Sequence, residues 1–277
     1  MKIKLHGVRG SYPTANKENA HYGGNTPCVE VIEGDQRIIL DAGTGIIGID
    51  FDNYYQNPRI DILLTHLHMD HIQGLGFCKP LFNPKKEVHI WGPGGSTHSL
   101  LSRLNRFLSP PLFPVVLRDI PCKLVIHEIT NSTFELGNFK ITSEFINHPG
   151  PTMGYRVQAN DRTLTYIPDH EPVIGKNHLF PEDKWTSGFD LAYDSDVLIH
   201  DSQYSPKEYT SRIGWGHCPI NIAAEFSSRT NVKNLILFHH DPSHSDTKIT
   251  EMLENLQNDH QYSFNIAMAV QGDEIEV

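Results

Sequence analysis

Histidine and aspartate are concentrated in six consecutive residues that read H-L-H-M-D-H and begin at His66. This run follows an apolar, strand-like stretch, Ile60–Thr65, at the point where a buried strand would leave its sheet. Residues two apart on an extended chain face the same way, so His66 and His68 can reach one metal ion. Asp70 and His71, one turn further on, can reach a second. Imidazole and carboxylate are preferred ligands of zinc and related divalent metals, so the run predicts a metal site.

Later apolar runs of the chain end in the same two residue types. The residues that close four of these runs are His148, Asp169, Asp201 and His239. One such ending is unremarkable, because aspartate often closes a strand in a turn. With the run at His66 there are five, and a layered α/β scaffold aims the ends of its strands into a common crevice. We therefore expect these side chains to converge on one site.

The count of ligands is sufficient for two metal ions. The first ion would be bound by the nitrogens of His66, His68 and His148. The second would be bound by the nitrogens of His71 and His239 and an oxygen of Asp70. The carboxylate of Asp169 would bridge the two ions, which lie roughly 3.5–4 Å apart in two-metal hydrolases. Such a set leaves room for a bridging water, which a catalytic site needs and a structural zinc site lacks. We predict two divalent ions, Zn²⁺ first, with Mn²⁺ and iron as alternatives.

Composition and length describe an ordinary globular protein. The chain has 277 residues, 38% of them hydrophobic and 20% charged, which suits a single domain over 1–277 near the upper size limit. No apolar stretch approaches the ~20 residues that span a bilayer, and the first residues form a predicted strand rather than a secretion signal. The four scattered cysteines are expected to be small buried hydrophobic residues. Together these features predict a cytoplasmic protein without a membrane partner.

The charge balance bears on the partner. Acidic residues number 33 against 23 basic ones, for a formal net charge of −10. Long nucleic acid is bound largely through neutralisation of its phosphates by Lys and Arg, which an acidic surface opposes. A small anion drawn to a local metal charge is not opposed. We therefore expect a small phosphodiester substrate and no long nucleic acid.

The elements that must position these residues are mostly strands. Apolar, β-branched runs bounded by Gly, Pro, Asn or Asp recur along the whole chain. Helical patterns cover Ser99–Leu108, Ile220–Ser228 and a stripe over 249–256, with Pro219 expected at the first position of the second helix and Asp246 at the N-cap of the third. This mixture predicts an α/β protein in layers, with two sheets covered by outer helices.

One stretch, Trp91–Pro114, reads as an irregular insertion, with Gly-Pro-Gly-Gly near its start and Pro-Pro-Leu-Phe-Pro at its end. It is expected to be a lid, an arm that contacts a second subunit, or a capping loop.

The ordered ligands amount to a resemblance. The H-x-H-x-D-H run, followed by His148, Asp169 and His239, resembles the metallo-β-lactamase superfamily over nearly the whole chain. The resemblance implies a four-layer αββα sandwich with a dinuclear metal site at the edges of its sheets. Asp169 stands where the best-known subclass of true β-lactamases carries cysteine. This difference and the missing export signal argue against antibiotic hydrolysis.

Finer motifs are similar to two phosphodiesterase groups. Gly216-His217 and His200-Asp201-Ser202 resemble elements of ribonuclease Z. The N-terminal G-V-R-G-S-Y-P-T and Y-G-G-N-T, with D-H-E at Asp169 and F-H-H-D-P around His239, are closer to enzymes that degrade cyclic nucleotides, including the phage anti-Pycsar phosphodiesterases. The resemblance also implies a homodimer.

These residues suggest a mechanism. A metal-bridging hydroxide would attack phosphorus, while two cations stabilise the charge gained by the phosphate oxygens. His217 is the candidate general acid for the departing sugar oxygen, with Asp201 orienting it, and Asp70 joins the catalytic set through its metal. The alternative for His217 is a helix-capping or surface histidine.

The leading hypothesis is hydrolysis of 3′,5′-cyclic mononucleotides to nucleoside monophosphates. The alternatives are a ribonuclease Z-like endonuclease that processes transfer-RNA 3′ ends, a thioesterase or sulfur dioxygenase, and a non-catalytic nucleotide-binding protein.

Overall fold

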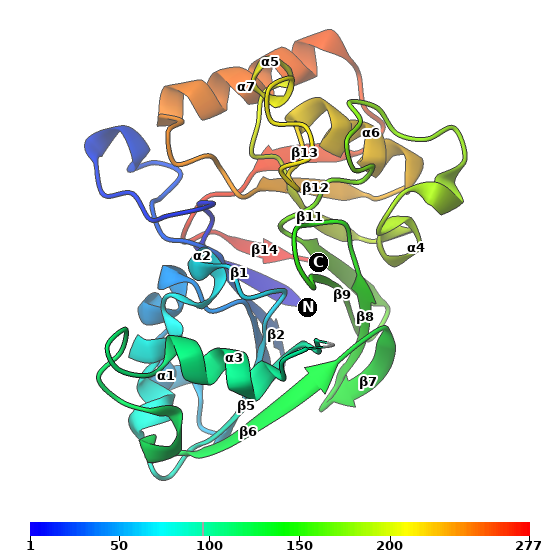
Figure 1. Ribbon diagram of the computed structural model, residues 1–277. Coiled ribbons are helices and arrows are strands. Elements are labelled where there is room, and N and C mark those ends of the chain that lie inside the picture. Colours follow the sequence, from blue (N-terminus) through cyan, green and yellow to red (C-terminus); the bar gives the residue numbers. More distant parts are fainter. Residues whose placement is uncertain (96) are drawn as a thin grey trace.

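The computed structural model describes residues 1–95 and 97–277, and over these residues the chain forms two seven-stranded sheets that pack face to face. Helices lie on the two outer sides (Figure 1). The predicted α/β architecture, two sheets between two helical layers, is confirmed.

The first sheet is antiparallel at one end and parallel at the other. Its strands, in spatial order, are β14 (Glu274–Glu276), β1 (Lys2–Gly7), β2 (Cys28–Glu33), β3 (Gln36–Leu40), β4 (Arg59–Leu63), β5 (Glu87–Pro93) and β6 (Lys123–Ile129). The strands from β3 to β6 run parallel, with Leu40 of β3 paired with Leu63 of β4. The carboxyl ends of β3 and β4 therefore meet at one edge, and the segment that begins at His66 leaves from that edge.

The second sheet repeats this arrangement. Its strands, in spatial order, are β13 (Asn265–Met268), β12 (Asn234–Phe238), β11 (Val197–Asp201), β10 (Arg162–Ile167), β9 (Met153–Ala159), β8 (Phe139–Phe145) and β7 (Ser132–Leu136). The strands from β10 to β13 are parallel. Asp169 follows β10, Asp201 ends β11 and His239 follows β12, so all three lie at the same edge of this sheet.

Short helices outnumber long ones. The α-helices are α1 (Phe51–Tyr54), α2 (Met69–Ile72), α3 (Leu100–Phe107), α4 (Phe189–Ala192), α5 (Pro206–Tyr209), α6 (Ile220–Arg229) and α7 (Asp246–Asp259). Single 3₁₀ turns cover Lys17–Asn19, Thr44–Gly48, Leu75–Phe77, Lys79–Phe82, Leu117–Asp119 and Asp183–Trp185. In Figure 1, α6 and α7 lie outside the second sheet, and α1 and α3 lie outside the first. Among the described helices none has the length and apolar character needed to cross a membrane.

The core has three apolar layers, because each sheet buries both of its faces over part of its width. Between the sheets, Ile3 and Leu5 of β1 alternate with half-exposed residues and pack on Tyr155 and Tyr166 of the second sheet. The inner parallel strands β4 and β12 are buried on both faces and read as nearly continuous apolar runs, as parallel sheets do. Each fully buried Leu or Ile contributes about 1.5–3 kcal/mol. This packing holds the two sheet edges together.

Details of the predicted elements need correction. Pro219 is the N-cap of α6 with extended backbone, not its first helical residue, because its φ of −78° and ψ of 151° lie outside the helical region. Ser245 is the N-cap of α7, and its side chain accepts a hydrogen bond from the Lys248 amide. Asp246, which we expected at that position, instead accepts hydrogen bonds from the His21 and Tyr22 amides. Strands β7 and β14 and the four-residue helices were not predicted.

The stretch Trp91–Pro114 is not irregular throughout, because it includes the helix predicted over Ser99–Leu108. It contains the end of β5 and the whole of α3, whose N-cap Ser99 accepts from the Ser102 amide. Leu100 and Leu104 of this helix are buried against the first sheet. Residue 96 of the stretch lies outside the described part of the chain.

Candidate metal centre

The chain between β4 and α2 carries the first four predicted ligands. After β4 the backbone remains extended, and the Leu64 amide donates to the Trp91 carbonyl before the chain reaches His66. His68 is the N-cap residue of α2, so Asp70 and His71 lie in the first turn of that helix. Side chains on an extended segment and side chains on the helix that follows it point in different directions, so they can line different parts of one crevice. This geometry separates the two histidines from the Asp–His pair that follows.

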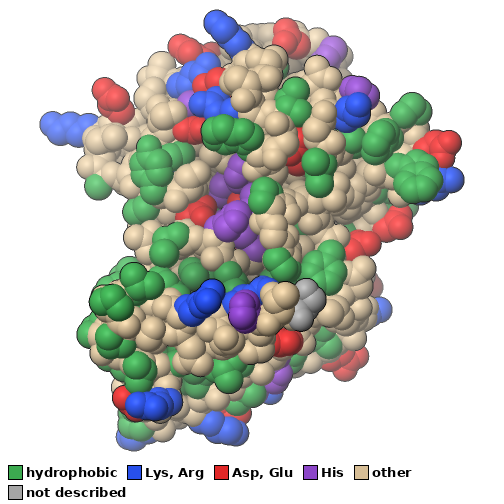
Figure 2. All heavy atoms as spheres, in the orientation of Figure 1, with side chains coloured by type: hydrophobic (Ala, Val, Ile, Leu, Met, Phe, Trp, Pro, Cys, Tyr) green, Lys and Arg blue, Asp and Glu red, His purple; other side chains and the backbone are tan. Residues whose placement is uncertain are grey.

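All seven predicted ligands meet at the facing edges of the two sheets. In each of two groups, one potential ligand atom per residue lies within 4.8 Å of the others, and Asp169 belongs to both groups. The first group is His66, His68, His148 and Asp169, and the second is Asp70, His71, Asp169 and His239. The division into two sets is the one inferred from the sequence. Figure 2 shows histidine side chains gathered in the hollow between the two halves of the molecule.

Short distances join the two sides of this centre. His148 Nε2 lies 3.1 Å from His68 Nδ1, so two nitrogens from opposite sheets face each other. His239 Nε2 lies 3.2 Å from Asp70 Oδ2 and 3.3 Å from Asp169 Oδ2. His71 Nε2 lies 2.9 Å from Asp169 Oδ1. Donor atoms of both sheets are thus close enough to share cations.

Three buried atoms of the centre test whether metal ions fit. Among the described residues, His66 Nε2, His71 Nε2 and Asp169 Oδ1 are shielded from solvent and make no hydrogen bond of good geometry, although the last two atoms lie 2.9 Å apart. A buried polar atom without a hydrogen-bond partner costs about 1–3 kcal/mol, so His66 Nε2 is unfavourable in this position unless something binds it. Imidazole nitrogens and carboxylate oxygens in groups of four suit divalent cations such as Zn²⁺. The residues present therefore fit metal ions.

Burial favours the metal-binding form of His66 and His148, whereas the carboxylates around His71 outweigh burial and raise its pKa well above the ordinary value. Burial lowers the pKa of His66 well below its ordinary value and lowers the pKa of His148 to about 4. Both imidazoles are therefore neutral at neutral pH, which is the ligating form. Burial acts to raise the pKa of Asp169, but the neighbouring His239 and His71 outweigh it and hold that pKa well below the usual range. A neutral imidazole beside an ionised carboxylate is the state that a cation requires.

Asp41 holds one ligand from behind. His71 Nδ1 donates to Asp41 Oδ2 at 2.8 Å, which leaves Nε2 directed at the metal groups. The same carboxylate accepts from the Thr65 amide at 2.7 Å and from the Tyr166 hydroxyl at 2.9 Å. Asp41 is fully buried, and its φ of 62° lies in the left-handed region. No role at the site was predicted for Asp41. The signal that could have marked it is the one used elsewhere, an aspartate that directly follows an apolar run.

The other ligands have partners of their own. His148 Nδ1 donates to the Gly216 carbonyl at 2.6 Å, which turns Nε2 toward the centre. His239 Nδ1 lies 3.1 Å from Gln203 Oε1, and Gln203 Nε2 donates in turn to Ser11 Oγ at 3.2 Å. None of Gly216, Gln203 and Ser11 was singled out as a ligand support from the sequence, because their roles depend on contacts between distant segments.

The N-terminal Gly10-Ser11 segment covers the second metal group. The Ser11 amide donates to Asp70 Oδ2 at 2.7 Å. A Cβ at Gly10 would lie 2.5 Å from His239 Nδ1, so only glycine fits against that imidazole. The G-S pair of the N-terminal motif is thereby explained by close packing on two ligands.

His217 lies beside the metal groups and is paired with Asp201. His217 Nδ1 lies 2.7 Å from Asp201 Oδ2 and 3.9 Å from Asp169 Oδ2. Its ring stacks on that of His239 with centroids 5.0 Å apart. Burial acts to lower the pKa of His217, but the charge and hydrogen bond of Asp201 outweigh it and raise the pKa to about 9. A pKa of about 9 leaves His217 protonated at neutral pH, and its side chain is largely buried rather than exposed at the surface.

Asp201 is itself held in place. Its Oδ2 also accepts from the His170 amide at 3.0 Å, and its Oδ1 accepts from the Gln203 amide at 2.9 Å. These bonds fix the carboxylate that orients His217. A third set of atoms within 4.8 Å, from Asp201, His217 and His239, lies next to the second metal group.

Three other histidines are buried away from the metal groups. His200 lies in the core and bonds to the Asp201 carbonyl and to His170 Nδ1, as expected for a hydrogen-bonded core histidine. His240 bonds to the Ala269 carbonyl, and His244 bonds to Glu208. Both are buried, so neither is a solvated loop residue.

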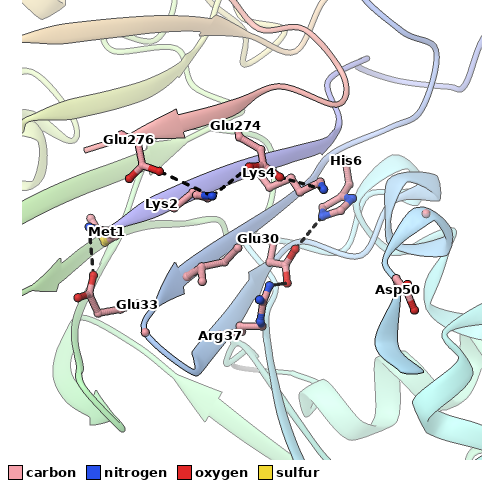
Figure 3. Close-up of a pocket in the computed structure, with 13 residues that line it drawn as sticks. Met1, Lys2, Lys4, His6, Glu30, Glu33, Arg37, Asp50, Glu274 and Glu276 are labelled. Atoms are coloured by element: carbon pink, nitrogen blue, oxygen red, sulfur yellow. Dashed lines mark hydrogen bonds and ion pairs between the residues drawn. The ribbon is translucent and has the colours of Figure 1, made fainter. Parts of the chain in front are cut away.

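A separate hollow of about 630 Å³ lies on the outer face of β14, β1 and β2 (Figure 3). Its charged side chains neutralise one another. Lys2 and Lys4 each lie 3.1 Å from Glu274, and His6 lies 3.0 Å from Glu30. None of the seven ligands lines it, and its two lysines are already paired with Glu274. The metal groups, not this hollow, are the candidate site.

The chain was compared with known protein families. A family model described as a β-lactamase superfamily domain matches residues 36–240, which contain all the predicted ligands. The chain belongs to the β-lactamase superfamily. Among curated superfamily relatives, the ribonuclease Z of Thermoplasma acidophilum is 24% identical over 95% of this chain and 93% of that protein. The ribonuclease Z of Thermococcus onnurineus is 23% identical over 78% of this chain and 79% of that protein.

Solved structures of the superfamily share the fold. The metallo-β-lactamase fold protein YhfI from Bacillus subtilis matches with a TM-score of 0.71 and 18% identity over 99% of each chain. Human short-form tRNase Z matches with a TM-score of 0.69 and 19% identity over 100% of this chain and 99% of that chain. These likenesses confirm the predicted metallo-β-lactamase fold. The family match supports a metal-dependent hydrolase, and the His and Asp clusters are compatible with divalent metal ions.

Proposed function

We propose that this protein is a phosphodiesterase that hydrolyses 3′,5′-cyclic mononucleotides to nucleoside monophosphates with two divalent ions, Zn²⁺ or Mn²⁺. The observation that carries the proposal is the shared position of Asp169 between two metal groups, with the His217–Asp201 pair directly beside them. Two groups of potential metal ligands that share one carboxylate would hold two ions close enough to bind the same phosphate.

Metal ions bound in these groups would polarise the phosphodiester, activate water and neutralise the charge that develops on the phosphate oxygens. The residues of the chain provide the rest. Asp41, Gly216 and Gln203 orient three of the imidazoles. His217, charged at neutral pH and aligned by Asp201, supplies the proton that the departing sugar oxygen needs.

Charge supports a small substrate. The net charge of −10 opposes the phosphate neutralisation on which binding of long nucleic acid depends. A cyclic mononucleotide carries one phosphodiester and needs no extended basic surface. The motifs around Gly10, Glu171 and His240 support the same choice through their similarity to enzymes that degrade cyclic nucleotides, the anti-Pycsar group included. We further propose that the protein acts as a homodimer.

A transfer-RNA-processing endonuclease is the second candidate. It is favoured by the relatives named ribonuclease Z, one of which matches 95% of this chain. The two activities share the metal centre and the protonated leaving oxygen, so they differ in substrate rather than in chemistry.

One comparison separates the two candidates. Purified protein with Zn²⁺ or Mn²⁺ is offered 3′,5′-cyclic nucleotides and, separately, a precursor transfer RNA. We expect nucleoside monophosphate from the parent protein and from Asp161→Ala, which alters an exposed turn aspartate. Asp169→Ala should abolish it. Cleavage of the RNA with intact cyclic nucleotides would overturn the proposal in favour of the endonuclease.

A further inference from the structure

Glu171 is a buried carboxylate that belongs to neither metal group. Its residue is 1% exposed, and among the described residues no Lys or Arg forms an ion pair with it. A buried carboxylate without compensation is strongly unfavourable. Four donors compensate it here, and they are the Gly175 amide at 2.9 Å, the Gly214 amide at 2.8 Å, the Gly216 amide at 2.9 Å and the Tyr209 hydroxyl at 2.9 Å.

Two of these donors, the amides of Gly214 and Gly216, lie in the loop between α5 and α6, which is drawn in yellow in Figure 1. The Gly214 amide donates to Glu171 Oε1, and the Gly216 amide donates to Oε2. Both oxygens of one carboxylate therefore hold the same short turn. The next residue along the chain is His217.

The turn held in this way touches the metal centre directly. The Gly216 carbonyl accepts from His148 Nδ1 at 2.6 Å, the bond that directs the other nitrogen of His148 toward the first metal group. Gly216 thus connects Glu171, through its amide, to the predicted metal ligand His148, through its carbonyl. The same residue precedes His217, which bonds to Asp201.

Unusual backbone angles and close packing restrict the conformation of this turn. Gly214 and Gly216 have φ values of +87° and +86°, which side chains rarely adopt. A Cβ at Gly216 would lie 2.1 Å from Pro149 Cδ and 2.6 Å from His148 Nδ1. The turn is packed against His148, and although the Trp215 amide donates to the Arg212 carbonyl, the amides of Gly214 and Gly216 are both held by Glu171.

We propose that Glu171 is a positioning residue whose carboxylate fixes the Gly214–Gly216 turn, and through it both the His148 imidazole and the His217 proton donor. Glu171 touches neither substrate nor metal. The part of the proposal that concerns His217 rests on the proposed function, whereas the part that concerns His148 rests only on metal binding.

The test replaces the carboxylate by its amide. Glu171→Gln keeps the shape of the side chain but turns one acceptor oxygen into a donor, so it cannot accept from both glycine amides. Two substrates are compared, a 3′,5′-cyclic nucleotide, whose sugar oxygen needs a proton to leave, and bis(p-nitrophenyl) phosphate, whose leaving group does not. Bound zinc and the melting temperature are measured on the same samples. Glu254→Gln, an exposed change on α7, is the matched control.

We expect Glu171→Gln to lower kcat on the cyclic nucleotide by about 10–100-fold and on the activated ester by less than about threefold, with KM little changed. Zinc affinity should fall by about tenfold, as for other partners of metal ligands. Glu171→Asp keeps both acceptor oxygens and should recover part of each loss. It also provides the same comparison of substrates if the glutamine variant folds poorly.

Other outcomes would overturn the proposal. Equal losses on both substrates, in step with a lower melting temperature, would give Glu171 a purely structural role. Unchanged kinetics and zinc affinity would remove any role. Failure of the proposed function is distinguishable, because the parent protein would then leave cyclic nucleotides intact while the zinc measurement on Glu171→Gln still tests the link to His148.

Discussion

Single residues behind the metal groups explain why the ligands face one another. The Asp41 carboxylate accepts hydrogen bonds from His71, Thr65 and Tyr166. Because Asp41 follows β3 of the first sheet and Tyr166 lies in β10 of the second, the bond to Tyr166 links the two sheets. One buried carboxylate therefore orients a ligand and joins the two halves of the core. Partners of this kind fix which ring nitrogen of a histidine carries the proton and which faces the metal.

The role of Asp41 is tested by Asp41→Asn. An amide in its place offers one acceptor oxygen rather than two, so the His71 imidazole loses its fixed orientation. We expect zinc affinity, measured by competition with a chromophoric chelator, to fall by about 10–100-fold. Asp161→Asn, an exposed change, should leave it unaltered. Parental affinity in Asp41→Asn would show that the orientation of His71 does not depend on this bond.

His217 is tested as the proton donor. Because it lies next to the metal groups but is bonded to Asp201, we expect His217→Ala to keep its bound metal and to lose about 10²–10⁴-fold in turnover of cyclic nucleotides. Metal content measured by atomic emission and steady-state rates give the two readouts. Loss of metal together with turnover would identify His217 as a ligand instead.

At the scale of elements, the site is built from loops that follow strands, and other segments hold these loops. Arg9 is fully buried and donates to the Gly23, Asp241 and His244 carbonyls, so it fastens the N-terminal segment to the chain beyond β12. Gly10 then lies on the His239 ring. The N-terminal motif thus serves as a rigid cover over the second metal group.

The close contact at Gly10 leads to a prediction. Gly10→Ala places a methyl group 2.5 Å from the His239 ring, which must move or displace the cover. We expect loss of one of two bound metal ions and at least a tenfold drop in kcat, read by metal analysis and by rate. Gly48→Ala is the control, because a Cβ there meets nothing within 4 Å. A fully loaded and active Gly10→Ala protein would contradict the tight packing.

Helix α5 provides a prediction about pH. Burial acts to raise the pKa of Glu208, but hydrogen bonds from Ser205 and His244 outweigh it and lower the pKa to about 2, below the ordinary 4.5. A lowered pKa in the folded state stabilises the fold above pH 4.5, and this contribution is lost as the pH falls toward 2. The parent protein should therefore exceed Glu208→Gln in unfolding free energy near neutral pH, with the gap closing over that range.

Urea unfolding at a series of pH values measures the gap. Glu254→Gln, on the exposed side of α7, should show no such dependence. A gap that stays constant down to pH 2 would mean that the Glu208 carboxylate is not the group responsible.

At the scale of the whole molecule, the metal centre joins two sheets. The segment after β4 supplies four ligands from one side, and the second sheet supplies His148, Asp169 and His239 from the other. A buried ligand atom at this junction that has no hydrogen bond, such as His66 Nε2, is unfavourable unless something binds it. Ions that bind only the folded state stabilise it, by about 2.7 kcal/mol when present at a hundredfold excess over the dissociation constant.

Removal of metal should therefore lower the melting temperature. We expect a chelator to shift the transition downward in differential scanning calorimetry and Zn²⁺ to restore it. In Asp169→Ala the difference between loaded and chelated protein should shrink, because the shared ligand is gone. Equal melting temperatures with and without chelator would show that the centre does not link folding to metal.

The sequence was informative where one short-range pattern sufficed. The predicted ligands follow apolar runs, and parallel strands bring their carboxyl ends to one edge, so the order of the seven residues along the chain is enough to group them. Glu171 could not be assigned a role, because the glycine amides at 214 and 216 that donate to it lie far away in the chain. Strand β14 was missed because Glu274–Glu276 is short and charged, and its pairing with β1 provides the only signal. The predicted start of α6 was one residue too early and that of α7 one residue too late, because the N-cap and the first turn of a helix favour similar residues.

The division of the ligands between the two sheets also determines when the centre can form during synthesis. Ribosomes release the chain from its N-terminus, so the segment with His66 and His71 emerges well before His239. Strand β1 must wait longer still for β14, its partner near the other end of the chain. A nascent chain therefore offers an incomplete set of ligands, and tight capture of cations is delayed until translation is nearly finished. Cellular metal supply then acts on the completed protein, and a chain truncated before His239 never acquires the second site.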